Sequence, residues 1–148
     1  MLRKFKKFSQ LSSEEKKLFF EAYVILGMMR VAILTISFKR LTCSLDHVAK
    51  KEETPILNDK EMDIAIKVGQ AITRAADYTP WNSACLAQSL TAQKMLKKRG
   101  VPGVFYLGAS KDKENMKAHA WSQCGETIIT GGDSHEEFTV LSVFRWER

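Results

Sequence analysis

The chain has 148 residues, of which 45% are hydrophobic and 27% are charged, and this composition fits one compact domain with an ordinary core. Its three cysteines, Cys43, Cys85 and Cys124, cannot all pair internally and form no CxxC motif. Cys43 and His47 have no second pair of ligands at zinc spacing, which argues against a metal site. An odd number of cysteines without a secretory signal predicts free thiols in a reducing compartment, the cytoplasm.

The net charge of +6 comes entirely from the N-terminal part of the chain. Residues 1–40 contain nine Lys or Arg and three Glu, whereas residues 41–148 contain 14 residues of each sign. Such a basic segment could attract an acidic peptide, a membrane surface or nucleic acid. Nucleic acid ranks last among these partners, because no aromatic-rich basic stripe or nucleic-acid motif accompanies the charge.

A long apolar helix is predicted at the N-terminus. Ser12 is its expected N-cap, with Glu15 completing a capping box, and the apolar pattern continues to about Phe38. The segment from Leu18 is long enough to cross a bilayer, but Glu21 and Arg30 interrupt it. These charges favour a helix in a soluble core or one that binds a partner. Because basic residues precede this segment, a helix that lies in a membrane interface is a further alternative.

The chain divides into an N-terminal basic and amphipathic helical segment, residues 1–45, and a core, residues 46–148. Residues 46–60 are polar and predict a linker. Asn58 or Asp59 can cap a second helix that Thr79-Pro80 ends.

A third helix is predicted from about Ser83 to Arg99, with Asn82 or Ser83 as its cap and Gly100 after its end. Cys85 would then lie in the first turn, where free backbone N–H groups and the helix dipole favour thiolate over thiol. The alternative interpretation is that Cys85 is a small core residue, because free cysteine is often buried.

After Gly100 the apolar period falls to about two residues, which predicts strands. Helices followed by an antiparallel sheet indicate an α+β fold. The predicted strands are Val104–Gly108, Ala118–Gln123, Thr127–Thr130 and Phe138–Phe144, with a polar turn over Lys111–Lys117.

His119 lies in the second of these strands, 34 residues after Cys85. A histidine that reaches a thiol can take its proton and later return it to a leaving amine. Cys85 and His119 are therefore the candidate nucleophile and base, although a half-buried structural histidine remains the alternative.

Two motifs carry a resemblance to a known family: Cys-Leu-x-x-Ser-Leu, which begins at Cys85, and Ala-His-Ala-Trp around His119. With the preceding Pro80-Trp81-Asn82-Ser83-Ala84, the chain resembles the transglutaminase-like peptidases of lasso-peptide biosynthesis, in their stand-alone form. The resemblance implies a papain-like cysteine peptidase, without cofactor or metal, that removes the leader from a ribosomally made precursor. It also implies a separate leader-recognition protein and an ATP-dependent macrocyclase as partners.

The third catalytic residue is left open by the sequence. The family pattern places an Asp about a dozen residues after the histidine, where this chain has Gly131 and Gly132. The nearest carboxylate is Asp133. With a turn centred on Gly125, His119 would lie opposite Gly131, and Asp133 would be a diagonal neighbour on the same face. Asp133 is thus either the third catalytic residue or a loop carboxylate, in which case a backbone carbonyl could support a Cys–His dyad.

Other parts of the site are less specific. The backbone N–H of Cys85 is the expected oxyanion donor, and Trp81 and Trp121 could wall the site, although core packing also explains such tryptophans. Two alternative functions remain open. A related acyl transferase would use the same thiolate, and a non-catalytic adaptor of the maturation complex would have lost the Asp.

Overall fold

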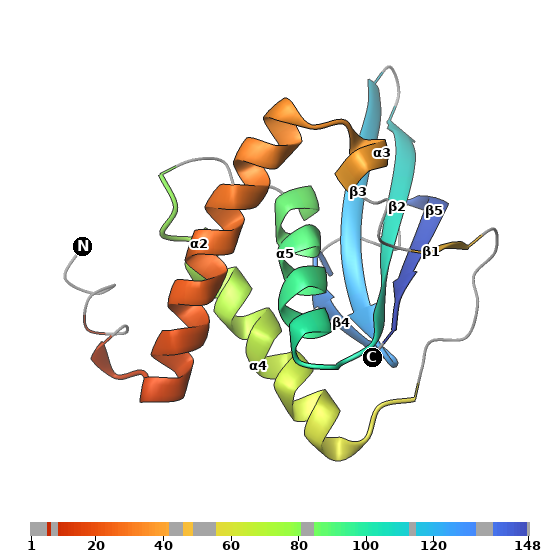
Figure 1. Ribbon diagram of the computed structural model, residues 1–148. Helices are drawn as coiled ribbons and strands as arrows, with labels where there is room; N and C mark the ends of the chain where they lie inside the picture. The colour runs from red at the N-terminus through yellow and green to blue at the C-terminus, as the bar shows by residue number, and fades with distance from the viewer. Residues whose placement is uncertain are drawn as a thin grey trace.

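The computed structural model describes residues 6, 9–41, 46–48, 56–80, 85–112, 115–132 and 138–147, in which helices cover one face of an antiparallel sheet (Figure 1). This arrangement confirms the α+β class. The helices are α2 (Ser13–Thr35), α3 (Phe38–Leu41), α4 (Asp59–Ala76) and α5 (Cys85–Lys98), and the strands are β1 (Asp46–Val48), β2 (Gly103–Asp112), β3 (Asn115–Cys124), β4 (Thr127–Thr130) and β5 (Thr139–Trp146).

The ends of the helices follow local signals. Ser12 accepts a hydrogen bond from the N–H of Glu15 at 3.2 Å, as an N-cap should. Asn58 and Glu61 form a complete capping box at the start of α4. Gly100 follows α5 with φ +71°, the left-handed conformation that commonly ends a helix. The predicted continuation of the first helix to Phe38 is wrong, because Ile36 is extended and separates α2 from α3.

The sheet has the strand order β1-β5-β2-β3-β4, and all its pairs are antiparallel. The predicted linker over residues 46–60 is wrong at residues 46–48, which form β1 at one edge of the sheet. The predicted turn over Lys111–Lys117 is also too long, since the β2–β3 ladder continues to the pair Asp112 and Asn115.

Each face of the sheet carries a hydrophobic cluster. The cluster on the helical side includes Phe105, Ala120, Phe144 and residues of α2, α4 and α5. The indole N–H of Trp146 donates to the Val101 carbonyl at 2.8 Å within it. The opposite face carries a smaller cluster, Val104, Tyr106, Trp121 and Val143, with Phe138 packed against it.

The helix α2 lies on the outside of the helical layer, against α4 and α5 (Figure 1). One face of α2 belongs to the same core as the sheet, so the N-terminal segment and the rest of the chain share one core. Glu21 fastens α2 to the end of α5 by an ion pair with Arg99, with Nη1 and Oε1 3.0 Å apart. Hydrogen bonds from Arg99 lower the pKa of Glu21, although partial burial opposes this shift.

Candidate functional site

Cys85 is the first residue of α5, which confirms its predicted place in the first turn. Its free thiol is half-buried and packs against the core cluster on the helical side of the sheet. At this position the backbone N–H groups have no partner within the helix and can stabilise an anion. Cys85 therefore combines solvent access with a position at the start of a helix. The predicted caps Asn82 and Ser83, and Trp81, lie outside the described residues.

Cys124 differs from Cys85 in burial. It is fully buried, and this burial raises the pKa of its thiol to about 12. The Cys124 thiol therefore stays protonated at neutral pH and cannot be the nucleophile. Of the two cysteines in the described part of the chain, only Cys85 has the exposure that a nucleophile needs.

His119 lies on β3 and is held on several sides. Its Nε2 lies 2.6 Å from the carbonyl oxygen of Gly131. The ring also lies against Trp121 and Phe138, with ring centroids 5.7 Å and 4.9 Å apart. Because a carbonyl can only accept, this bond requires the proton on Nε2 and leaves the lone pair of the neutral ring on Nδ1. The geometry thus selects the tautomer in which Nδ1 can act as a base.

Gly131 can place its carbonyl beside His119 because it has no side chain. Its φ of +74° lies in the left-handed region, and an added Cβ would collide with the carbonyl oxygen of Ala120. The sequence predicted that Gly131 lies opposite His119, and one alternative had a backbone carbonyl that supports His119 in a Cys–His dyad. The register of β3 and β4 differs from that of the predicted turn centred on Gly125. A bulge between Ser122 and Gln123 pairs Ser122 with Thr130, and the β3–β4 ladder ends before it reaches His119.

Gly131→Ala is therefore expected to destabilise the fold, by about 1–2 kcal/mol from the left-handed backbone alone. The contact with Ala120 adds to this loss. Urea unfolding measures the effect. Gly132→Ala is the matched control, because its added Cβ would lie no closer than 3.3 Å to its nearest neighbour, the Cγ2 methyl group of Ile128, and its φ is not positive. Equal stability of the two variants would contradict this explanation.

Buried hydroxyl groups connect α5 to the strands near His119. Ser89, one helical turn after Cys85, lies 3.2 Å from Thr130 between hydroxyl oxygens, and Thr130 lies 2.6 Å from Ser122. Thr130 directly precedes Gly131. The face of α5 that carries Cys85 is therefore fixed against the end of β4, the segment that also holds the His119 ring.

The structure does not join the two candidate catalytic side chains. Along β3, Ala120 and Ser122 face α5, whereas His119 lies with Trp121 on the opposite face. Both Cys85 and His119 are described, and no hydrogen bond connects them. In unliganded enzymes catalytic hydrogen bonds are often long and form only with substrate. Asp133 lies outside the described residues.

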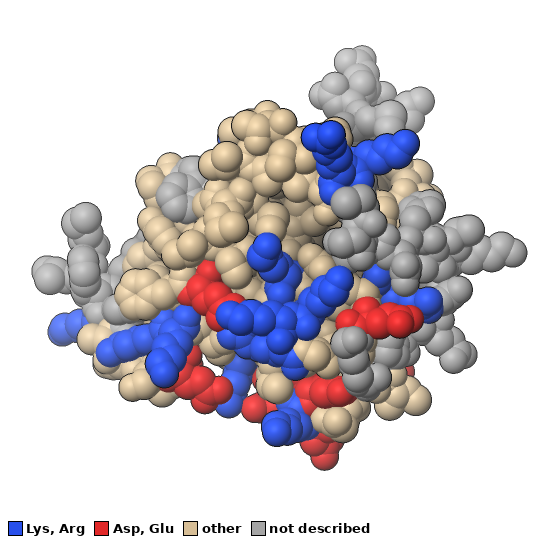
Figure 2. All heavy atoms as spheres, in the orientation of Figure 1, with Lys and Arg blue, Asp and Glu red and all other residues tan. Residues whose placement is uncertain are grey.

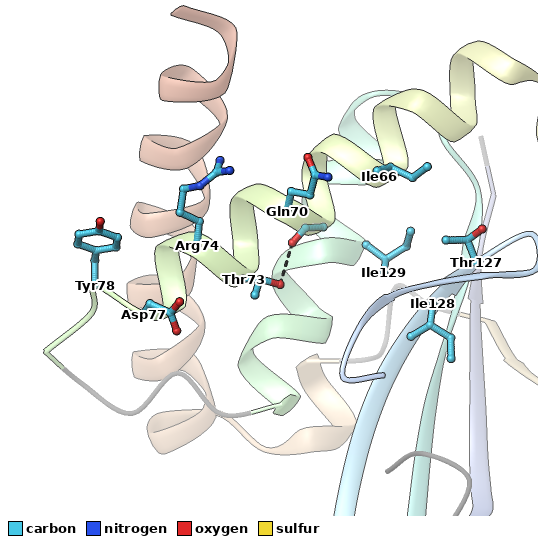
Figure 3. Close-up of a pocket in the computed structure, with 10 residues that line it drawn as sticks. Ile66, Gln70, Thr73, Arg74, Asp77, Tyr78, Thr127, Ile128 and Ile129 are labelled. Carbon is cyan, nitrogen blue, oxygen red and sulfur yellow. Dashed lines mark hydrogen bonds between the residues drawn. The ribbon is translucent and has the colours of Figure 1, made fainter. Parts of the chain in front are cut away.

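A groove of about 710 Å³ lies between α4 and β4 (Figure 3). Gln70 and Arg74 contribute polar groups from one side of α4, and Ile128 and Ile129 line the other wall. Arg74 forms no ion pair within the described part of the chain. Nothing in the sequence pointed to this groove, because it depends on how α4 packs against the edge strand.

No group of three or more His, Cys, Asp or Glu that could hold a metal ion occurs among the described residues. The candidate groups are a thiol, an imidazole and backbone groups. These groups suit acyl transfer through a thioester.

Comparison with known proteins gives one match. A family model described as the transglutaminase-like superfamily matches residues 27–143, which is most of the chain and includes both Cys85 and His119. No curated protein and no solved structure matches significantly. Transglutaminase-like domains generally have cysteine-peptidase or acyl-transferase activity.

Proposed function

This chain belongs to the transglutaminase-like superfamily, and from that premise we propose that it is a cysteine peptidase that removes the leader from a ribosomally synthesised lasso-peptide precursor. A separate recognition protein presents the leader, and an ATP-dependent macrocyclase uses the freed amine of the core peptide. The reaction takes place in the cytoplasm and needs no cofactor. Two observations carry the proposal: a half-buried cysteine lies at a helix start, and a histidine has its Nε2 held by the carbonyl of Gly131.

In the proposed mechanism, the Cys85 thiolate attacks the carbonyl carbon of the last leader residue, while Nδ1 of His119 holds the proton taken from the thiol. The backbone N–H of Cys85 stabilises the oxyanion. Nδ1 then gives its proton to the departing amine, and a thioester joins the leader to Cys85. Water hydrolyses this thioester, and the thiol regains its proton. Throughout, the carbonyl of Gly131 holds Nε2–H and stabilises the charged imidazolium.

The mechanism requires His119 to approach Cys85 when the substrate binds. The ring lies beyond the last pair of the β3–β4 ladder, Ser122 and Thr130, so β4 does not confine it on that side. We therefore assign the described position of the ring to the resting enzyme.

The substrate peptide has a natural path along the groove beside β4. In the described sheet β4 pairs only with β3, so its other edge can pair with an extended peptide. A peptide on this edge would run towards Gly131 and His119. Arg74 would offer it a positive charge from α4.

The function is tested by incubating the protein with a lasso-peptide precursor and its leader-recognition protein, and then measuring the masses of the products. Two fragments whose masses sum to the precursor plus one water show hydrolysis. An added amine that appears on the leader fragment in place of water would identify an acyl transferase. An intact precursor would favour the non-catalytic adaptor.

Asp133→Asn distinguishes the two forms of the mechanism. Because the Gly131 carbonyl already occupies Nε2 of His119, we expect the cleavage rate of this variant to stay within a few-fold of the wild type. Single-turnover cleavage measures it. A fall by orders of magnitude would instead make Asp133 the third catalytic residue, because its charge would then stabilise the imidazolium.

A further inference from the structure

The helix α2 has an unusual outer face. Phe20, Val24, Met28, Val31 and Leu34 are each 52–66% exposed, although they are large and apolar. Their spacing of three or four residues places them along one side of the helix. The stripe runs over most of a helix that is about 34 Å long at 1.5 Å per residue. Such a long apolar strip on a folded protein indicates a surface that something covers.

The composition of α2 is apolar enough for contact with lipid. It is long and apolar enough to cross a membrane, with a mean hydropathy of 1.7, and only 28% of this apolar segment is buried. Core helices and signal sequences pass the same test, so composition alone does not decide. The buried face of α2 decides whether the helix can cross a membrane. Leu18, Ala22 and Leu26 lie in the core shared with the sheet, so α2 cannot cross a bilayer without opening that core.

Positive charge borders the stripe. Lys94 and Lys98 of α5 line a hollow with Phe20 and Val24. Figure 2 shows basic side chains gathered in the middle of this face, below an area without charged side chains over the upper part of α2. The carboxylate in the hollow is Glu21, which Arg99 and Lys98 bind. An anionic surface would therefore meet cations and no unpaired carboxylate in this hollow.

We propose that the outer face of α2 docks the protein on the surface of an anionic membrane, with the helix parallel to the bilayer. An apolar stripe bordered by lysines is the pattern of an interfacial helix, whose apolar side chains enter the acyl boundary while the basic groups contact lipid phosphates. Figure 1 shows α2 on the outside of the helical layer, so the exposed side chains of its outer face can lie along a flat surface. The inference does not depend on the peptidase activity.

Flotation of the full chain with vesicles tests the proposal. We expect binding to vesicles of 70% phosphatidylcholine and 30% phosphatidylglycerol, and at least several-fold weaker binding to pure phosphatidylcholine or at high salt. Leu34→Glu should lower the bound fraction several-fold. Leu141→Glu on β5 is the matched control, because Leu141 is also 66% exposed but lies away from the stripe. Circular dichroism confirms that both variants fold.

Light scattering in solution measures the oligomeric state and so distinguishes two other molecules that could cover the stripe, a second copy of the chain and a protein partner. A protein that stays off anionic vesicles and forms a dimer sensitive to Leu34→Glu would overturn the proposal in favour of a second copy of the chain. A protein that stays off vesicles as a monomer would overturn it in favour of a protein partner. Equal loss of vesicle binding in Leu34→Glu and Leu141→Glu would also contradict it.

Discussion

Cys85→Ala should abolish cleavage of the precursor, with a fall in rate of about 10⁴-fold or more, because the variant lacks the atom that forms the thioester. The fold should survive, since the thiol is small, half-buried and at a helix end. The measurement is single-turnover cleavage by mass, with thermal unfolding to compare stability.

Cys124→Ala is the matched control. Cys124 is fully buried, and burial keeps it protonated, so its removal should leave cleavage intact and cost about 1 kcal/mol of stability. Iodoacetamide on the native protein should modify the peptide that contains Cys85 and spare the one that contains Cys124. Cleavage by Cys85→Ala at the wild-type rate would exclude Cys85 as the nucleophile.

His119→Ala should lower the rate by about 10²–10⁴-fold, the usual contribution of a general acid and base. It should also slow alkylation of Cys85 near neutral pH in the fraction of molecules whose His119 ring has left the resting position, because an imidazolium beside Cys85 would stabilise the thiolate. This second effect reports whether the two side chains meet in solution, although no hydrogen bond connects them in the structure.

His47→Ala provides the control for His119→Ala, because His47 lies in β1 at the opposite edge of the sheet. In the His47→Ala variant, the rate of Cys85 alkylation and the rate of precursor cleavage should equal those of the wild type. If His119→Ala also leaves both rates unchanged, the base is another residue.

The sequence was sufficient for features that depend on near neighbours. Ser12, Asn58 and Gly100 mark helix ends through bonds and backbone angles within a few residues, so their roles were predictable. The first-turn position of Cys85 follows from the same kind of signal.

Features that depend on distant partners were not predictable in the same way. The strand Asp46–Val48 is too short to carry an alternating pattern and exists through its pairing with β5. Alternation along β3 groups His119 with Trp121, but only tertiary packing decides which face of the strand meets α5. The carbonyl of Gly131 is a backbone group, so no side chain in the sequence marks it as the partner of Nε2.

Intact-mass measurement of an acid-quenched reaction shows whether Cys85 carries the leader as a thioester after His119 has moved its proton. We expect a transient species with the mass of the protein plus the leader minus one water, attached at Cys85 and absent from Cys85→Ala. Cleavage of the precursor without this species, or its attachment at another residue, would exclude the proposed thioester at Cys85.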